Sequence, residues 1–107
     1  MKEPPMLIDF SNYPGPVYTG RSRGELIRAE LHLDDVDSTD RLVNVKIPAA
    51  TYSLTSSFFL GLFGPSVTRA GSQHAFFQKF NFDTSTALTE AFSDYVARAL
   101  QEKRLFN

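Results

Sequence analysis

The sequence contains no cysteine and no tryptophan among its 107 residues. Without cysteine the chain cannot form a disulfide bond or a thiolate metal site, so its stability must come from a packed core. No apolar run has the length of a membrane-spanning helix or the pattern of a secretory signal peptide. We therefore expect a cytoplasmic protein that does not insert into a membrane.

An excess of charge of either sign is also missing. The chain carries eleven Lys and Arg against twelve Asp and Glu, for a net charge of −1. Proteins that bind nucleic acid usually present a strongly basic surface, so we expect no nucleic-acid partner. The two histidines, His32 and His74, lack the paired spacing of a zinc site, and the acidic segment 33–40 lacks the glycine and final glutamate of an EF-hand loop. Accordingly, we expect neither a metal ion nor a cofactor.

Apolar residues, in contrast, are plentiful: 42% of the chain is hydrophobic and ten residues are Phe. This composition and this length fit one domain with a sizeable core. We expect that domain at residues 6–103, with flexible ends at 1–5 and 104–107.

Hydrophobic periodicity and turn residues predict alternating strands and helices. Strands are expected at 6–10, 17–19, 42–48 and 75–82, and helices at 22–33, from 55–57 to about 67, and at 86–103. This order predicts a small two-layer α/β sandwich, in which a mixed β-sheet carries helices mainly on one face. Residues 17–19 are expected to form a hairpin with the first strand, and Pro65 to kink or break the middle helix near Gly64.

The first helix is expected to begin at Ser22, which has the spacing of a capping box with Glu25. Leu26 and Ile27 belong to an apolar stripe that should face the sheet, whereas Arg28 should lie in solvent.

The turn before this helix offers a first candidate site. Residues 15–22 read GPVYTGRS, which differs from the phosphate-binding pattern G-x-x-x-x-G-K-[ST] only by Arg21 in place of lysine. In such a loop Gly15 and Gly20 would let the backbone approach a phosphate or nucleotide, and Arg21 and Ser22 would contact it. Pro16 and Val17 stiffen the loop, however, and a plain turn is the interpretation that we favour.

The aromatic segment 58–63 is expected to be core, because its residues recur at helical spacing. Gly61 and Gly64 would give this helix a small face that another chain could approach closely, with Phe58 beside it. A structural subunit that oligomerises through this face is therefore an alternative function.

Thr55, Ser56 and Ser57 form a hydroxyl cluster just before the aromatic helix. Any of the three suits the N-cap, where a side-chain oxygen accepts a hydrogen bond from a backbone N–H. The functional alternative is phosphorylation, because a phosphate at a helix N-terminus meets unpaired N–H groups and the positive end of the helix dipole. No G-x-S-x-G or comparable motif points to nucleophilic catalysis, and we expect no enzymatic activity.

The Tyr-Pro-Gly turn at 13–15, the segment GELIR at 24–28 and the run from 56 to 67 resemble the STAS-like domain family of unknown function. The resemblance spans about residues 8–100. This family groups small bacterial proteins near the anti-sigma-factor antagonists, in which a serine at the matching strand–helix junction is phosphorylated by a partner kinase. Here Thr55 and Phe58 stand where those antagonists carry Asp and Gly.

The resemblance implies a STAS-like fold and a non-catalytic regulatory module that binds another protein. The implied partner is a histidine-kinase-like ATPase or another signalling protein, and the implied switch is phosphorylation within Thr55–Ser57.

Overall fold

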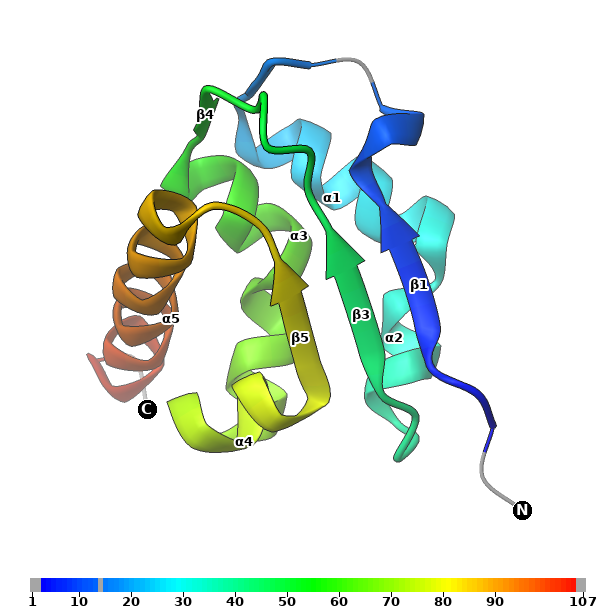
Figure 1. Cartoon of the computed structure of the whole chain (residues 1–107). Coiled ribbons are helices and arrows are strands. Elements are labelled where there is room, and N and C mark those ends of the chain that lie inside the picture. Colours follow the sequence, from blue (N-terminus) through cyan, green and yellow to red (C-terminus); the bar gives the residue numbers. More distant parts are fainter. Residues whose placement is uncertain (1–2, 14, 106–107) are drawn as a thin grey trace.

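A computed structural model describes residues 3–13 and 15–105 of the chain. Strands β1 (Met6–Asp9), β3 (Val43–Lys46) and β5 (Phe80–Asp83) form one sheet in the order β1-β3-β5. Figure 1 shows this sheet in front of the helices, which lie behind it and beside β5. The predicted two-layer α/β architecture with helices mainly on one face is thereby confirmed. Of the ends expected to be flexible, residues 1, 2, 106 and 107 lie outside the described residues.

All pairings in both sheets are parallel, so the expected mixed sheet is wrong. After β1 the chain forms a short 3-10 helix, η1 (Phe10–Asn12), and then β2 (Val17–Tyr18). Strand β2 does not return beside β1 as a hairpin; it pairs with β4 (Ser53–Leu54), which follows β3. Strands β1 and β3 run in the same direction, β2 follows β1, and β4 follows β3. Both short strands therefore extend beyond the same end of the sheet, where they can pair in parallel.

The sheet buries one face only. Val43 and Val45 of β3 are fully buried toward the helices, whereas Asn44 and Lys46 are exposed on the other face. The same alternation in β1 leaves Leu7 61% exposed. This pattern is the period of two that a half-covered strand requires, and it explains why β3 could be recognised in the sequence.

Helix α1 (Arg21–Leu31) begins one residue earlier than expected, and the predicted capping box is wrong. Its N-cap is Gly20, which has a φ of 91° and makes no side-chain capping bond. Ile27 is buried as expected, but Leu26 is 61% exposed and Arg28 only 7% exposed, the reverse of the expected burial at these two positions. His32 ends α1 in the left-handed conformation, and part of the expected acidic loop forms α2 (Leu33–Asp37).

Arg28 is buried because polar groups from two other helices surround it. Its guanidinium donates to the Leu62 carbonyl oxygen and to Ser66 Oγ, each at 2.9 Å. It also pairs with Asp37, whose side chain is 5% exposed. A buried charge is tolerated only when it is paired and hydrogen-bonded, and this environment meets both conditions.

Helix α3 (Ser56–Ala70) continues through Pro65, so of the expected kink or break near Gly64 the break does not occur. A proline inside a helix removes one backbone N–H and leaves the carbonyl four residues earlier, here that of Gly61, without its donor. Arg28 donates to the carbonyl of the next residue, Leu62. This contact from α1 supports the helix at the turn that the proline weakens.

Residues 73–79 form helix α4 (Gln73–Lys79), so the expected strand at 75–82 is correct only from Phe80 onward. Ser72 caps α4, and its side chain accepts a hydrogen bond from the Ala75 N–H at 3.1 Å. Phe76 and Phe80 stack with ring centroids 4.8 Å apart. Their spacing of four fits a helical turn as well as one face of a strand, which is why the sequence pattern was ambiguous.

Helix α5 (Thr86–Leu105) matches the predicted helix and lies beside β5 in Figure 1. Its residue Phe92 is buried, as are Phe63 of α3 and Val45 of β3. The Phe59 ring of α3 packs against α5, with its centroid 5.0 Å from that of Phe92. The core is therefore a cluster of phenylalanine rings between sheet and helices.

Helices α1 and α3 cross at backbone contact. A Cβ added at Gly24 would lie 2.3 Å from the Phe58 carbonyl oxygen, and one added at Gly61 would lie 2.2 Å from the Arg21 carbonyl oxygen. Both distances are far below van der Waals contact, so no side chain fits at either position.

We predict that Gly24→Ala lowers the free energy of unfolding by at least about 2 kcal/mol, because the helices must separate to admit a methyl group. Urea denaturation monitored by circular dichroism measures the free energy of unfolding. Gly64→Ala is the matched control, since a Cβ there meets only Leu60 Cβ at 3.9 Å. It should change stability by less than about 1 kcal/mol. Equal effects of the two substitutions would contradict the proposed crossing.

Candidate functional site

The hydroxyl cluster lies at the start of α3, and its three members have different surroundings. Thr55 is the N-cap: its Oγ1 accepts a hydrogen bond from the Phe58 N–H at 3.3 Å. Ser56 and Ser57 follow as the first two residues of the helix, and Ser57 is exposed while Ser56 is partly buried. Capping is thus the task of Thr55, and the Ser57 side chain faces solvent.

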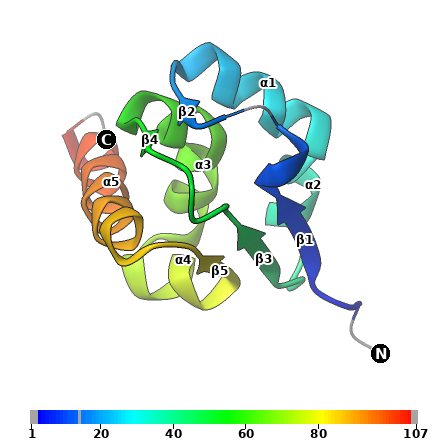
Figure 2. The ribbon, with the colours of Figure 1, turned by 45° about the horizontal axis from the view of Figure 1, so that its top comes forward.

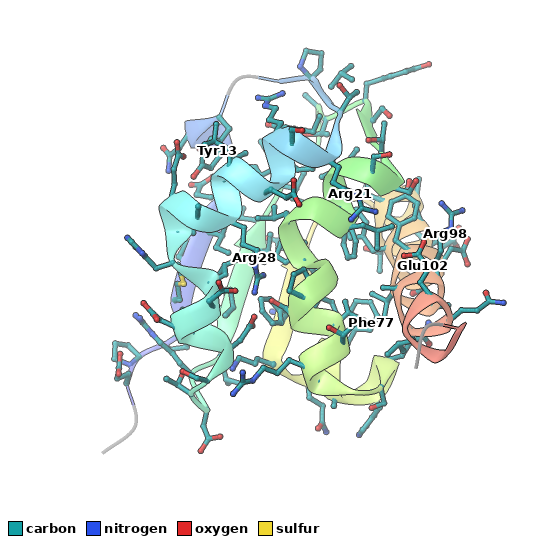
Figure 3. All side chains as sticks on the ribbon, turned by 180° about the vertical axis from the view of Figure 1, so that it is seen from behind. Tyr13, Arg21, Arg28, Phe77, Arg98 and Glu102 are labelled. Atoms are coloured by element: carbon teal, nitrogen blue, oxygen red, sulfur yellow. The ribbon has the colours of Figure 1, made fainter. Side chains whose placement is uncertain are left out.

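Arginines of α1 lie close to this end of α3. The Arg23 guanidinium lies 5.9 Å from the centroid of the Phe58 ring and 5.3 Å from that of Tyr18, both at cation–π distance. Figure 3 shows Arg21, the first residue of α1, next to the first turns of α3. No pattern in the sequence points to Arg23, because only the crossing of the two helices brings it to Phe58. Positive charge from α1 therefore adds to the positive end of the α3 dipole.

Phe58 and Gly61, which the sequence offers as contacts for another chain, are buried. The close neighbour of Gly61 is the Arg21 backbone of α1, so the approach that glycine permits here is within the chain. Gly64 is partly buried and faces open space beyond Leu60. Of the proposed small face, only Gly64 is left for a second chain to contact.

The Gly15–Ser22 segment does not have the shape of a loop wrapped around a phosphate. Its middle, Val17–Tyr18, is the extended strand β2, and the Tyr18 carbonyl accepts a hydrogen bond from the Thr55 N–H at 3.0 Å. Gly15 has a packing role, since a Cβ there would lie 2.8 Å from the Tyr18 hydroxyl oxygen. Gly20, Arg21 and Ser22 belong to the start of α1 and are exposed.

The Tyr18 side chain is hydrogen-bonded to the backbone of the segment that precedes β2. Its hydroxyl donates to the carbonyl oxygens of Phe10 and Tyr13, at 3.1 and 3.0 Å. Burial raises the pKa of Tyr18, although the nearby Arg23 charge acts in the opposite direction. Burial, together with the Glu30 carboxylate, also raises the pKa of Tyr13. Because a raised pKa favours the protonated phenol, Tyr18 remains a hydrogen-bond donor at neutral pH.

Asp9, at the end of β1, is the N-cap of η1 and accepts a hydrogen bond from the Ser11 N–H at 2.9 Å. Hydrogen bonding from Ser11 lowers the pKa of Asp9, and the Lys46 charge adds to this effect. The carboxylate is therefore ionised at neutral pH and suited to capping rather than to proton transfer.

Within residues 3–13 and 15–105, no group of three or more His, Cys, Asp and Glu side chains is arranged to hold a metal ion. Over the same residues, no helix combines the length and the apolar character needed to cross a bilayer.

Comparison of the chain with protein-family models, with curated proteins and with solved structures finds no match. The resemblance of residues 8–100 to the STAS-like family therefore stays a prediction based on sequence motifs.

We predict that Thr55→Ala lowers the free energy of unfolding by about 1 kcal/mol, because α3 loses its capping oxygen. Ser57→Ala is the matched control: it removes a neighbouring hydroxyl that does not cap, and it should be nearly neutral. Urea denaturation of both variants measures the difference. A larger loss of stability for Ser57→Ala than for Thr55→Ala would contradict the assignment of Thr55 as the cap.

We further predict that Arg21→Ala changes neither the fold nor the binding of phosphate compounds, because Gly15–Ser22 forms a strand and a helix start. Calorimetric titration of wild type with ATP and GTP should detect no binding. Binding by wild type that is lost in Arg21→Ala would instead support the phosphate-binding alternative for this segment.

Proposed function

We propose that this protein is a non-catalytic regulatory module that binds a protein partner through the surface around the start of α3. Phosphorylation of Ser57, or of Ser56 beside it, switches that binding. One observation carries the proposal: Thr55 caps the helix, so the exposed Ser57 hydroxyl is not required for folding. A hydroxyl without a structural task at an exposed helix start is open to modification.

The surroundings of Ser57 favour a phosphate physically. A phosphoserine carries a charge of about −1.5 to −2 at neutral pH, and at the second position of a helix it meets unpaired N–H groups. The Arg23 guanidinium, at cation–π distance from the ring of the next residue, Phe58, adds positive charge nearby. The modification should therefore leave the fold intact while it reverses the local charge of the surface.

The class of partner comes from the family resemblance. It suggests a histidine-kinase-like ATPase or another signalling protein, and a setting in the bacterial cytoplasm. The helix that bears Ser57 is suited to presenting such a surface, because its backbone is in direct contact with α1 at Gly24 and Gly61. A partner would thus meet a rigid rather than an adaptable site.

The test separates stability from binding. We expect Ser57→Asp to leave the free energy of unfolding within about 0.5 kcal/mol of wild type, since Asp is favourable in the first turn of a helix. The same substitution should weaken binding to the product of the neighbouring gene by at least about tenfold in calorimetry. Ser93→Asp is the charge-matched control, because Ser93 is exposed on α5. It should leave the affinity unchanged.

Mass spectrometry of the protein from its native host supplies the second measurement. We expect phosphate on Ser57 or Ser56. Equal affinities for wild type and Ser57→Asp, together with unmodified serines, would reduce the cluster to a helix cap and overturn the proposal.

A further inference from the structure

A pocket of about 280 Å³ opens at the end of the sheet where β1 and β3 lead into their connections. It is lined by Phe10, Ser11, Tyr13, Gly15, Pro16, Tyr18, Pro48, Ala50 and Thr51. Figure 2 turns this end of the molecule toward the viewer. In parallel sheets the carboxyl ends of the strands are where ligands commonly bind, and this pocket lies at such an end.

The walls of the pocket are rings in fixed positions. Tyr13 and Tyr18 both meet Phe10 edge to face, with centroids 5.9 and 5.2 Å apart. The Tyr18 hydroxyl is bound to two backbone carbonyls, which prevents its ring from turning into the space. Pro16 and Pro48 add two side chains with almost no conformational freedom. A ligand would therefore find the aromatic surface already arranged.

The electrostatic character of the lining restricts what can bind. None of the lining residues carries a charge, and the polar side chains among them are the hydroxyl groups of Ser11, Thr51 and the two tyrosines. An ion that entered would lose hydration without meeting a side chain of opposite charge in the lining. An uncharged ring loses little on leaving water and gains edge-to-face or stacked contacts with Tyr13 and Tyr18.

The volume of the pocket limits the size of the ligand. Cavities of roughly 150 Å³ accept benzene, and pockets for drug-sized ligands begin at roughly 300 Å³. From the lining, its charge and its size, we propose that this pocket binds an uncharged planar compound of one or two rings. The site is separate from the phosphorylation switch proposed above and does not depend on it.

The experiment titrates the full chain, labelled with ¹⁵N, with benzamide and with indole while its amide resonances are recorded by NMR. Benzoate, which has the shape of benzamide and a negative charge, tests the requirement for an uncharged ligand. Cyclohexanecarboxamide, which keeps the amide but not the planar ring, tests the requirement for aromaticity. We expect benzamide and indole to shift the amide resonances of residues 10–13, 15, 17, 18 and 49–51. Benzoate and cyclohexanecarboxamide should bind at least about tenfold more weakly.

Two neighbouring alanines give matched variants. Both are exposed, but Ala50 lines the pocket and Ala49 does not. Ala50→Leu should weaken benzamide binding at least about tenfold, and Ala49→Leu should leave it unchanged. A second pair of variants keeps the test valid if a variant of the first pair fails to fold. Tyr13→Ala removes part of the pocket wall, whereas Tyr52→Ala removes an 85% exposed ring that lies outside the lining. Only the former should reduce binding.

The proposal is overturned if benzamide and indole leave the amide resonances of residues 10–13, 15, 17, 18 and 49–51 unchanged at 10 mM, a concentration of roughly ten times the dissociation constant of a millimolar ligand. Shifts that persist in both Ala50→Leu and Tyr13→Ala would overturn it as well, because the rings would then bind elsewhere. Equal binding of benzoate and benzamide would refute the charge argument on which the ligand class rests.

Discussion

The structure depends on the crossing of α1 and α3 at direct backbone contact. Gly24 and Gly61 leave no side chain between the two helices, so the backbone of each limits how the other can move. This closeness lets Arg28 reach the Leu62 carbonyl and Ser66 of α3. It also brings Arg23 over the Phe58 ring at the start of α3. A single steric constraint thus sets both the buried polar contact and the charge around the candidate site.

The buried Arg28 ties three helices together at one point. Removing a guanidinium from water has a large desolvation cost, which is offset only if its donors and its charge are satisfied. Asp37 of α2 supplies the charge, and Ser66 Oγ donates to the same carboxylate at 2.9 Å while it accepts from Arg28. The position of Arg28 turns α1 so that the neighbouring Leu26 faces solvent.

These features mark the limit of what the sequence could predict. Strand β3 and helix α5 were predictable because their apolar residues repeat with the period of a single element. The placement of the hydroxyl cluster at a helix start followed from local capping preferences. The contacts of Arg28 with Leu62 and Ser66, and the proximity of Arg23 to Phe58, join residues more than thirty positions apart. No local pattern contains that information, and the Phe76–Phe80 spacing was compatible with either type of element.

The parallel topology places the pocket and the start of α3 at the same end of the molecule, with Tyr18 between them. One surface of this residue lines the pocket, while its ring lies 5.5 Å from Phe58 and under the Arg23 guanidinium. Gly15 packs against the tyrosine so closely that even a methyl group there would be 2.8 Å from the hydroxyl oxygen. The ring therefore has little room to yield toward Gly15. Phe58, on the other side of Tyr18, is itself fully buried, so the wall that Tyr18 gives the pocket is held in place from both sides.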